Sequence, residues 1–155
     1  MGITLVEALE RAAEVERGGA RFYRHLAQRT TDAEAREFFA GLAAEEVQHA
    51  EALERHRRDL NQSVDDLPDP ALLALEGSPW LKQTFLISLD RALAAALKAE
   101  RSAADFYSGL AEMTTGETRG FFLGLARVEQ RHVERLRRWH ERHFAGTPVI
   151  EEESK

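Results

Sequence analysis

The stretch Glu45-Glu46-Val47-Gln48-His49 decides how the rest of the chain is interpreted. It contains a Glu-x-x-His pair, Glu46 and His49, whose spacing of three residues is close to one turn of an α-helix. A carboxylate and an imidazole at this spacing point to the same side of a helix, as two ligands of one metal ion must. A second pair, Glu129 and His132, follows 83 residues later. Two pairs indicate metal binding far more specifically than one, because single pairs are common on solvated helices.

The helix expected before each pair carries one glutamate in an otherwise apolar stripe. Apolar residues recur every three or four positions around Glu16 and around Glu100, as they do on the buried face of an amphipathic helix. A glutamate on such a face is the exception that needs an explanation. The other stripe residues are Leu5, Leu9, Ala12, Gly19, Tyr23 and Leu26 around Glu16, and Leu86, Leu89, Leu93, Ala96, Ala103, Tyr107 and Leu110 around Glu100.

The two halves of the chain repeat each other. At an offset of 84, Glu16, Phe22-Tyr23 and Thr30-Thr31 correspond to Glu100, Phe106-Tyr107 and Thr114-Thr115; at an offset of 83, Phe38-Phe39, Glu46 and His49 correspond to Phe121-Phe122, Glu129 and His132. The repeat also separates two candidate ligands. Glu45 corresponds to Val128, whereas Glu46 corresponds to Glu129, so Glu46 is the predicted ligand.

Start and stop signals divide the chain into four predicted helices. Helix starts are expected at the capping boxes Thr4-x-x-Glu7, Thr31-x-x-Glu34 and Thr114-x-x-Glu117, and at Ser78-Pro79. Residues 59–79 hold three of the four prolines and lack helical periodicity, which predicts a long crossover between the second and third helices. We therefore expect an all-α four-helix bundle over residues 1–148, with a disordered acidic tail at 149–155.

Composition limits the class of protein. The 155 residues suffice for one domain, and 43% hydrophobic with 31% charged residues is ordinary for a globular chain. A net charge of -6 argues against a nucleic acid or an anionic membrane as the main partner. Without a signal sequence or a long apolar run, we expect a cytoplasmic protein. The absence of cysteine excludes disulfides, zinc ribbons and rubredoxin-type iron.

The motifs amount to a family resemblance. Glu16-x-x-Gly19-x-x-Phe22-Tyr23 and Glu46-x-x-His49, each with a second copy, resemble the rubrerythrin-like branch of the ferritin-like di-iron superfamily, and the ligand set is also similar to that of bacterioferritins. The fold implied is a ferritin-like four-helix bundle. The resemblance implies six ligands for two metal ions: Glu16, Glu46, His49, Glu100, Glu129 and His132.

The resemblance also implies an activity. Two metal ions, Fe/Fe or Fe/Mn, would serve an oxidoreductase that acts on peroxide or oxygen under oxidative stress. It would take electrons from an external donor, because the cysteine-ligated domain of rubrerythrins proper is missing. The alternative is an iron-binding ferroxidase that handles iron without catalytic turnover. Tyr23 and Tyr107 would donate hydrogen bonds to ligand carboxylates, or be plain core aromatics. Val47 stands where bacterioferritins carry the haem methionine, so no haem is expected. We also expect the protein to form a homodimer.

The remaining histidines and the arginine-rich helix ends have simpler interpretations. His25, His56, His140 and His143 have no counterparts in the repeat, and we expect them to be solvated. Arginines gather near the expected ends of the second and fourth helices, where cations interact favourably with the helix dipole. Docking of an acidic redox partner is the functional alternative for the arginines, which include Arg55, Arg57, Arg58, Arg135, Arg137 and Arg138.

Overall fold

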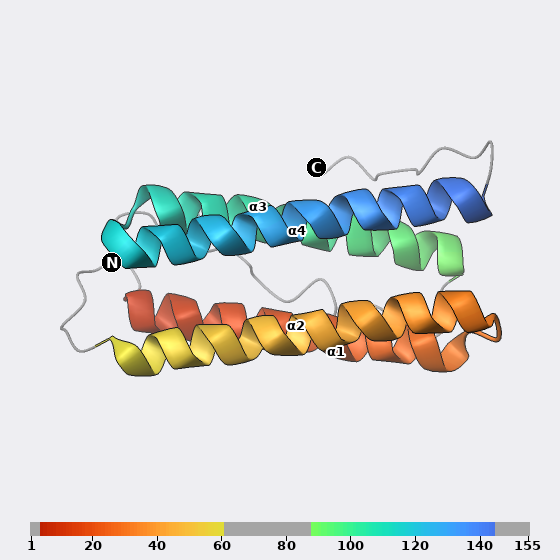
Figure 1. Cartoon of the computed structure of the whole chain (residues 1–155), viewed down its shortest axis with the longest axis horizontal. Coiled ribbons are helices and arrows are strands. Elements are labelled where there is room, and N and C mark those ends of the chain that lie inside the picture. Colours follow the sequence, from red (N-terminus) through yellow and green to blue (C-terminus); the bar gives the residue numbers. More distant parts are fainter. Residues whose placement is uncertain (1–3, 61–87, 145–155) are drawn as a thin grey trace. The chain divides into compact units, whose positions relative to one another are not determined.

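The computed structural model describes residues 4–60 and 88–144, and all regular structure in these ranges is α-helical. The four helices are α1 (Leu5–Arg29), α2 (Ala33–Asp59), α3 (Leu89–Glu112) and α4 (Gly116–His143), as Figure 1 shows. The predicted all-α class with four long helices is confirmed. Among the described residues, no helix has an apolar stretch long enough to cross a membrane.

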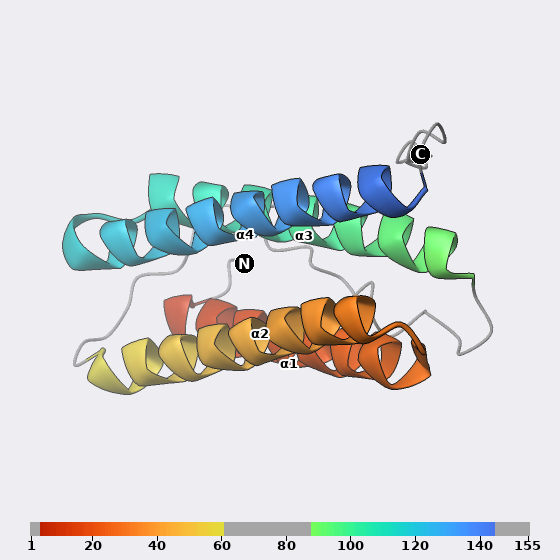
Figure 2. The ribbon, with the colours of Figure 1, turned by 45° about the vertical axis from the view of Figure 1, so that its right-hand side comes forward.

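Consecutive helices pair into two hairpins. α1 packs along α2, and α3 packs along α4, with the two helices of each pair running antiparallel (Figure 2). A connection of three residues joins the helices within each hairpin. The chain divides into two compact units, Met1–Trp80 and Leu81–Lys155, of which the first contains α1 and α2 and the second α3 and α4. The internal repeat of the sequence is thus a repeat of a helical hairpin.

Several predictions fall outside the described residues. These are the crossover at 59–79 beyond Leu60, the helix start at Ser78-Pro79 and the acidic tail at 149–155. Within the described range, α3 begins at Leu89, where the Ser88 hydroxyl accepts a hydrogen bond of 3.3 Å from the backbone N–H of Arg91.

The helix caps differ in part from the predicted ones. The capping box of α1 is confirmed, because Thr4 and Glu7 exchange backbone and side-chain hydrogen bonds of 3.0 and 3.1 Å. The cap of α2, however, is Asp32 and not Thr31, and its carboxylate accepts a hydrogen bond of 2.8 Å from Ala35 N–H. A carboxylate at this position both accepts the hydrogen bond and interacts favourably with the helix dipole, which explains why it serves as the cap.

The N-cap of α4 also lies one residue later than the predicted Thr114. Its N-cap is Thr115, with no side-chain hydrogen bond, and Gly116 follows with a φ of 62°, a backbone conformation that glycine adopts without strain. The Thr114 hydroxyl instead donates a hydrogen bond of 2.8 Å to the carbonyl oxygen of Leu110. Thr30 does the same to Leu26 at 2.7 Å. The two equivalent threonines therefore finish the preceding helices and do not start the next ones.

Each hairpin has an apolar core that continues around buried carboxylates. Leu9, Leu42 and Leu53 are fully buried in the first unit, as are Leu93, Leu110 and Leu136 in the second. Four glutamates are at most 2% exposed, although glutamate is almost never fully buried without a partner. They are Glu16, Glu46, Glu100 and Glu129, which are the four carboxylates that the sequence predicted as ligands.

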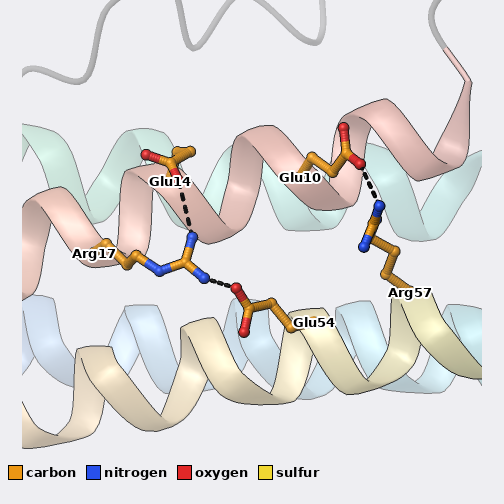
Figure 3. A network of polar contacts seen from close by, with 5 residues as sticks. All are labelled: Glu10, Glu14, Arg17, Glu54 and Arg57. Atoms are coloured by element: carbon orange, nitrogen blue, oxygen red, sulfur yellow. Dashed lines mark hydrogen bonds and ion pairs between the residues drawn. The ribbon is translucent and has the colours of Figure 1, made fainter.

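Ion pairs between solvent-accessible side chains link α1 to α2 in the first hairpin. Arg17 contacts Glu54 on α2 and Glu14 on its own helix, the latter at 2.9 Å, as Figure 3 shows. Arg57 on α2 lies 2.7 Å from Glu10 on α1. Exposed pairs of this kind contribute little stability, about 0 to 1 kcal/mol each.

Candidate metal centre

In the first hairpin, one glutamate of α1 meets the Glu-x-x-His pair of α2. His49 Nδ1 lies 3.5 Å from Glu16 Oε2 and 3.8 Å from Glu46 Oε2. All three residues offer ligand atoms that lie within 4.8 Å of one another. Glu46 and His49 face the same side of α2 because three residues nearly complete one helical turn.

The second hairpin repeats this arrangement. His132 Nδ1 lies 3.5 Å from Glu100 Oε2 and 3.4 Å from Glu129 Oε2. Glu100 comes from α3, and the other two residues come from α4. The hairpins therefore contain equivalent clusters, each with two carboxylates and one imidazole, at positions related by the sequence repeat. We call these the first cluster (Glu16, Glu46, His49) and the second cluster (Glu100, Glu129, His132).

The clusters differ in the exposure of their histidines. The side chain of His49 is 12% exposed, whereas that of His132 is 1% exposed. Burial by itself lowers the pKa of His132, but the adjacent carboxylates of Glu100 and Glu129 outweigh it and raise the pKa to about 11. In the metal-free chain the imidazole of the second cluster is thus protonated, and a cation lies between its two carboxylates.

Each cluster is a set of donors suited to a metal ion. Carboxylate oxygens and imidazole nitrogens are the ligands of iron, manganese and zinc sites in proteins. The raised pKa of His132 shows that the second cluster holds a positive charge in the form of a proton, which a metal ion can replace when the imidazole becomes neutral.

Tyr23 and Tyr107 lie in the interiors of their hairpins, at 0% and 1% exposure. Tyr23 packs edge-on against Phe22 with ring centroids 5.6 Å apart, and Tyr107 stacks with Phe122 at 6.4 Å. Both tyrosines thus take part in aromatic packing. A role for their hydroxyl groups beside the carboxylates stays a prediction.

His140 was expected in solvent, and this prediction was wrong. The residue is 1% exposed, its Nε2 lies 2.9 Å from Asp90 Oδ1, and its ring stacks on Phe144 with centroids 4.9 Å apart. It joins the beginning of α3 to the end of α4. His140 continues the buried stripe of α4 at helical spacing from Val133 and Leu136, and this pattern could have predicted its burial. The internal repeat could not, because His140 has no histidine counterpart in the first half.

Comparison with known proteins places this geometry in a structural class. A crystal structure from Thermotoga maritima, of a protein assigned to the ferritin-like diiron-carboxylate proteins, matches with a TM-score of 0.70 at 20% sequence identity. The match covers 94% of this chain and 99% of that one. The fold is therefore ferritin-like, as the sequence predicted.

The family follows from the sequence itself. The model of the rubrerythrin family matches residues 7–72 and 91–155, one match for each half of the chain. The chain belongs to the rubrerythrin family. Among curated proteins, no sequence matches it.

Proposed function

We propose that the two clusters bind two metal ions, most readily iron, as Fe/Fe or Fe/Mn. On this proposal the protein is an oxidoreductase that acts on peroxide or oxygen with electrons from an external donor. The observation that carries the proposal is the repeated Glu, Glu, His geometry, with His Nδ1 to carboxylate distances of 3.4 to 3.8 Å in both hairpins. Ferritin-like di-iron proteins use the same set, one Glu from each of two helices and Glu-x-x-His from each of the other two.

Charge balance supports two divalent ions. The four buried glutamates bring four negative charges when ionised, and two divalent ions neutralise them. Burying these carboxylates without cations is unfavourable, because isolated charges in a low-dielectric interior are costly. With neutral imidazoles the metal-bound set carries no net charge, so the metals and the buried ligands satisfy each other.

Each residue of the two clusters would have a defined role in metal binding. His49 and His132 would each bind one metal ion as a neutral imidazole. Glu16 would add a carboxylate to the ion of His49, and Glu100 would add one to the ion of His132. Glu46 and Glu129, the glutamates of the Glu-x-x-His pairs, would supply the remaining carboxylates. Bound iron would supply the redox chemistry towards peroxide or oxygen. The surrounding apolar residues would keep bulk water away and hold the ligands in position.

A ferroxidase that handles iron without catalytic turnover is the second candidate. Leu97 favours it, because this fully buried residue occupies the position, three residues before Glu100, where rubrerythrins proper carry an additional glutamate. The set of six ligands is then closer to that of bacterioferritins. In this case iron is the substrate and leaves the protein after oxidation.

One experiment separates the two candidates. Metal-free protein is titrated anaerobically with ferrous ion, exposed to peroxide, and then supplied with a reductant and more peroxide. Repeated peroxide consumption with iron retained supports the oxidoreductase. Release of iron, or growth of a ferric mineral after a single oxidation, supports iron handling. Failure to bind ferrous ion contradicts both.

A further inference from the structure

The exposed face of α4 carries a stripe of arginines. Arg127, Arg131, Arg135, Arg138 and Arg142 follow one another at spacings of four, four, three and four residues, so they lie along one side of the helix. All are exposed except Arg135, which is half-buried. We call these five residues the arginine stripe.

The internal repeat provides a control for this stripe. At the offset of 83, Arg127, Arg131 and Arg135 correspond to Ala44, Gln48 and Ala52 of α2, whereas Arg138 corresponds to Arg55 and Arg142 to Asp59. The hairpin architecture therefore does not require arginine at these positions. Both helices keep their Glu-x-x-His pair, but only α4 carries arginines at the three mid-helix positions of the opposite face.

Helix stability does not explain the stripe either. Arginines at i and i+4, such as Arg127 with Arg131, repel each other and weaken a helix. A helix dipole favours cations in the last turn, which accounts for Arg142, but Arg127 and Arg131 lie in the middle of Gly116–His143. Arg127 and Arg131 thus oppose folding slightly as a pair, and an acidic partner bound to them offsets this repulsion.

The charge of the stripe contrasts with that of the rest of the protein. The whole chain has a net charge of -6, yet residues 88–144 contain ten Lys and Arg against eight Asp and Glu. Two of those eight acids, Glu100 and Glu129, are buried in the second cluster. A basic face on an acidic protein orients an acidic partner towards that face during association.

We propose that the arginine stripe is the docking surface for an acidic electron-donor protein. The inference rests on the proposed oxidoreductase function, which needs an external donor because the chain has no cysteine to hold an iron–sulfur centre of its own. Glu129 and His132 lie on the buried side of the same helix, between Arg127 and Arg135 in sequence. A donor docked on the stripe is separated from these ligands by the thickness of one helix, about 10 Å.

The electron balance defines the donor. Reduction of one hydrogen peroxide to two waters consumes two electrons and two protons. Two molecules of a one-electron donor, such as a reduced [2Fe–2S] ferredoxin, supply these electrons and are each oxidised once. Solvent supplies the protons.

The test compares two double variants that each remove two positive charges. Arg127→Gln/Arg131→Gln disrupts the stripe, and Arg21→Gln/Arg24→Gln changes two exposed residues of α1 as the control. Binding of an acidic plant-type [2Fe–2S] ferredoxin to the full chain is measured by calorimetry at low and at physiological ionic strength. We expect the stripe variant to raise Kd about tenfold and to reduce its salt dependence, and the control to change Kd less than about twofold.

The outcomes separate the docking surface from the proposed function. Absence of ferredoxin binding to the wild type, or equal losses in both variants, overturns the docking surface. Tighter binding of a single-stranded oligonucleotide than of ferredoxin also overturns it, because the stripe is then a nucleic-acid surface. If the stripe variant alone loses binding but the iron-loaded wild type reduces no peroxide with any reductant, docking stands and the oxidoreductase function fails. Peroxide reduction with a small uncharged hydroquinone should be the same in all three proteins.

Discussion

The Nδ1 atom of His132 lies 3.5 Å from Glu100 Oε2, and His49 Nδ1 lies 3.5 Å from Glu16 Oε2 in the other hairpin. Two separate helix pairs have thus arrived at the same arrangement of imidazole and carboxylate. Both arrangements depend on one glutamate in the apolar stripe of the leading helix and one Glu-x-x-His pair in the following helix. Their repetition is difficult to explain by packing alone, because four buried carboxylates are unfavourable without cations.

Replacing Glu46 should impair metal binding, whereas replacing its neighbour should not. Glu46→Gln removes a carboxylate that is 2% exposed and faces His49, while Glu45→Gln changes a residue whose counterpart is Val128. We expect Glu46→Gln to reduce the amount of bound iron by at least half. The affinity for the remaining iron should fall by about 10- to 100-fold. Elemental analysis after anaerobic loading gives the stoichiometry. Equal iron contents in the two variants would show that the repeat has identified the wrong glutamate.

The metal-free protein should lose stability as the pH rises above neutrality. The pKa of His132 is raised from 6.5 to about 11 in the folded chain. Its protonated form therefore stabilises the fold fully below about pH 6.5, and this stabilisation is lost progressively as the pH rises through about 11. Urea unfolding of chelator-treated protein between pH 6 and pH 11, compared with His132→Gln, isolates the contribution. A difference between the two proteins that does not shrink with rising pH would contradict the assignment.

His140 should contribute to stability without contributing to metal binding. His140→Ala leaves a cavity and removes the 2.9 Å contact with Asp90, so we expect a loss of about 1–3 kcal/mol in the free energy of unfolding. Glu141→Ala, at the exposed next position, should change it by less than about 0.5 kcal/mol. Denaturant unfolding measures both. Iron binding by His140→Ala under native conditions should match the wild type, and a large loss of iron would mean that the pair acts on the metal centre.

The cap of α2 can be tested by adjacent substitutions. Asp32→Ala removes the carboxylate that accepts the Ala35 N–H at 2.8 Å, and we expect a cost of about 1 kcal/mol. Thr31→Ala changes an exposed residue just outside the cap and should be close to neutral. Thermal unfolding in the presence of a chelator compares them. A larger loss of stability in Thr31→Ala than in Asp32→Ala would show that Thr31 is the cap.

The fold was predictable because several independent signals agreed. The 3.6-residue periodicity, the Thr4 capping box and the offset repeat all indicated two helical hairpins, and the structure has them. The predicted starts of α2 and α4 were wrong by one residue. Runs such as Thr30-Thr31-Asp32 offer several side chains that can cap a helix. Only the geometry shows that Thr30 bonds backwards to Leu26 while Asp32 bonds forwards to Ala35.

The candidate site was predictable in composition but not in its environment. The repeat alone selected Glu46 over Glu45 and paired Glu16 with Glu100. It could not show that His132 is more deeply buried than His49, because exposure depends on packing around each side chain and not on the residue's position in a motif. His140 was missed for a related reason, since it belongs to one hairpin only.

Anomalous X-ray scattering from crystals of the iron-loaded protein, recorded on both sides of the iron absorption edge, tests the central claim most directly. We predict two iron ions, one at about 2 Å from a ring nitrogen of His49 and the other at about 2 Å from a ring nitrogen of His132. Glu16, Glu46, Glu100 and Glu129 should complete the ligand set. An absence of iron at these six residues, with metal elsewhere or nowhere in the crystal, would contradict the account.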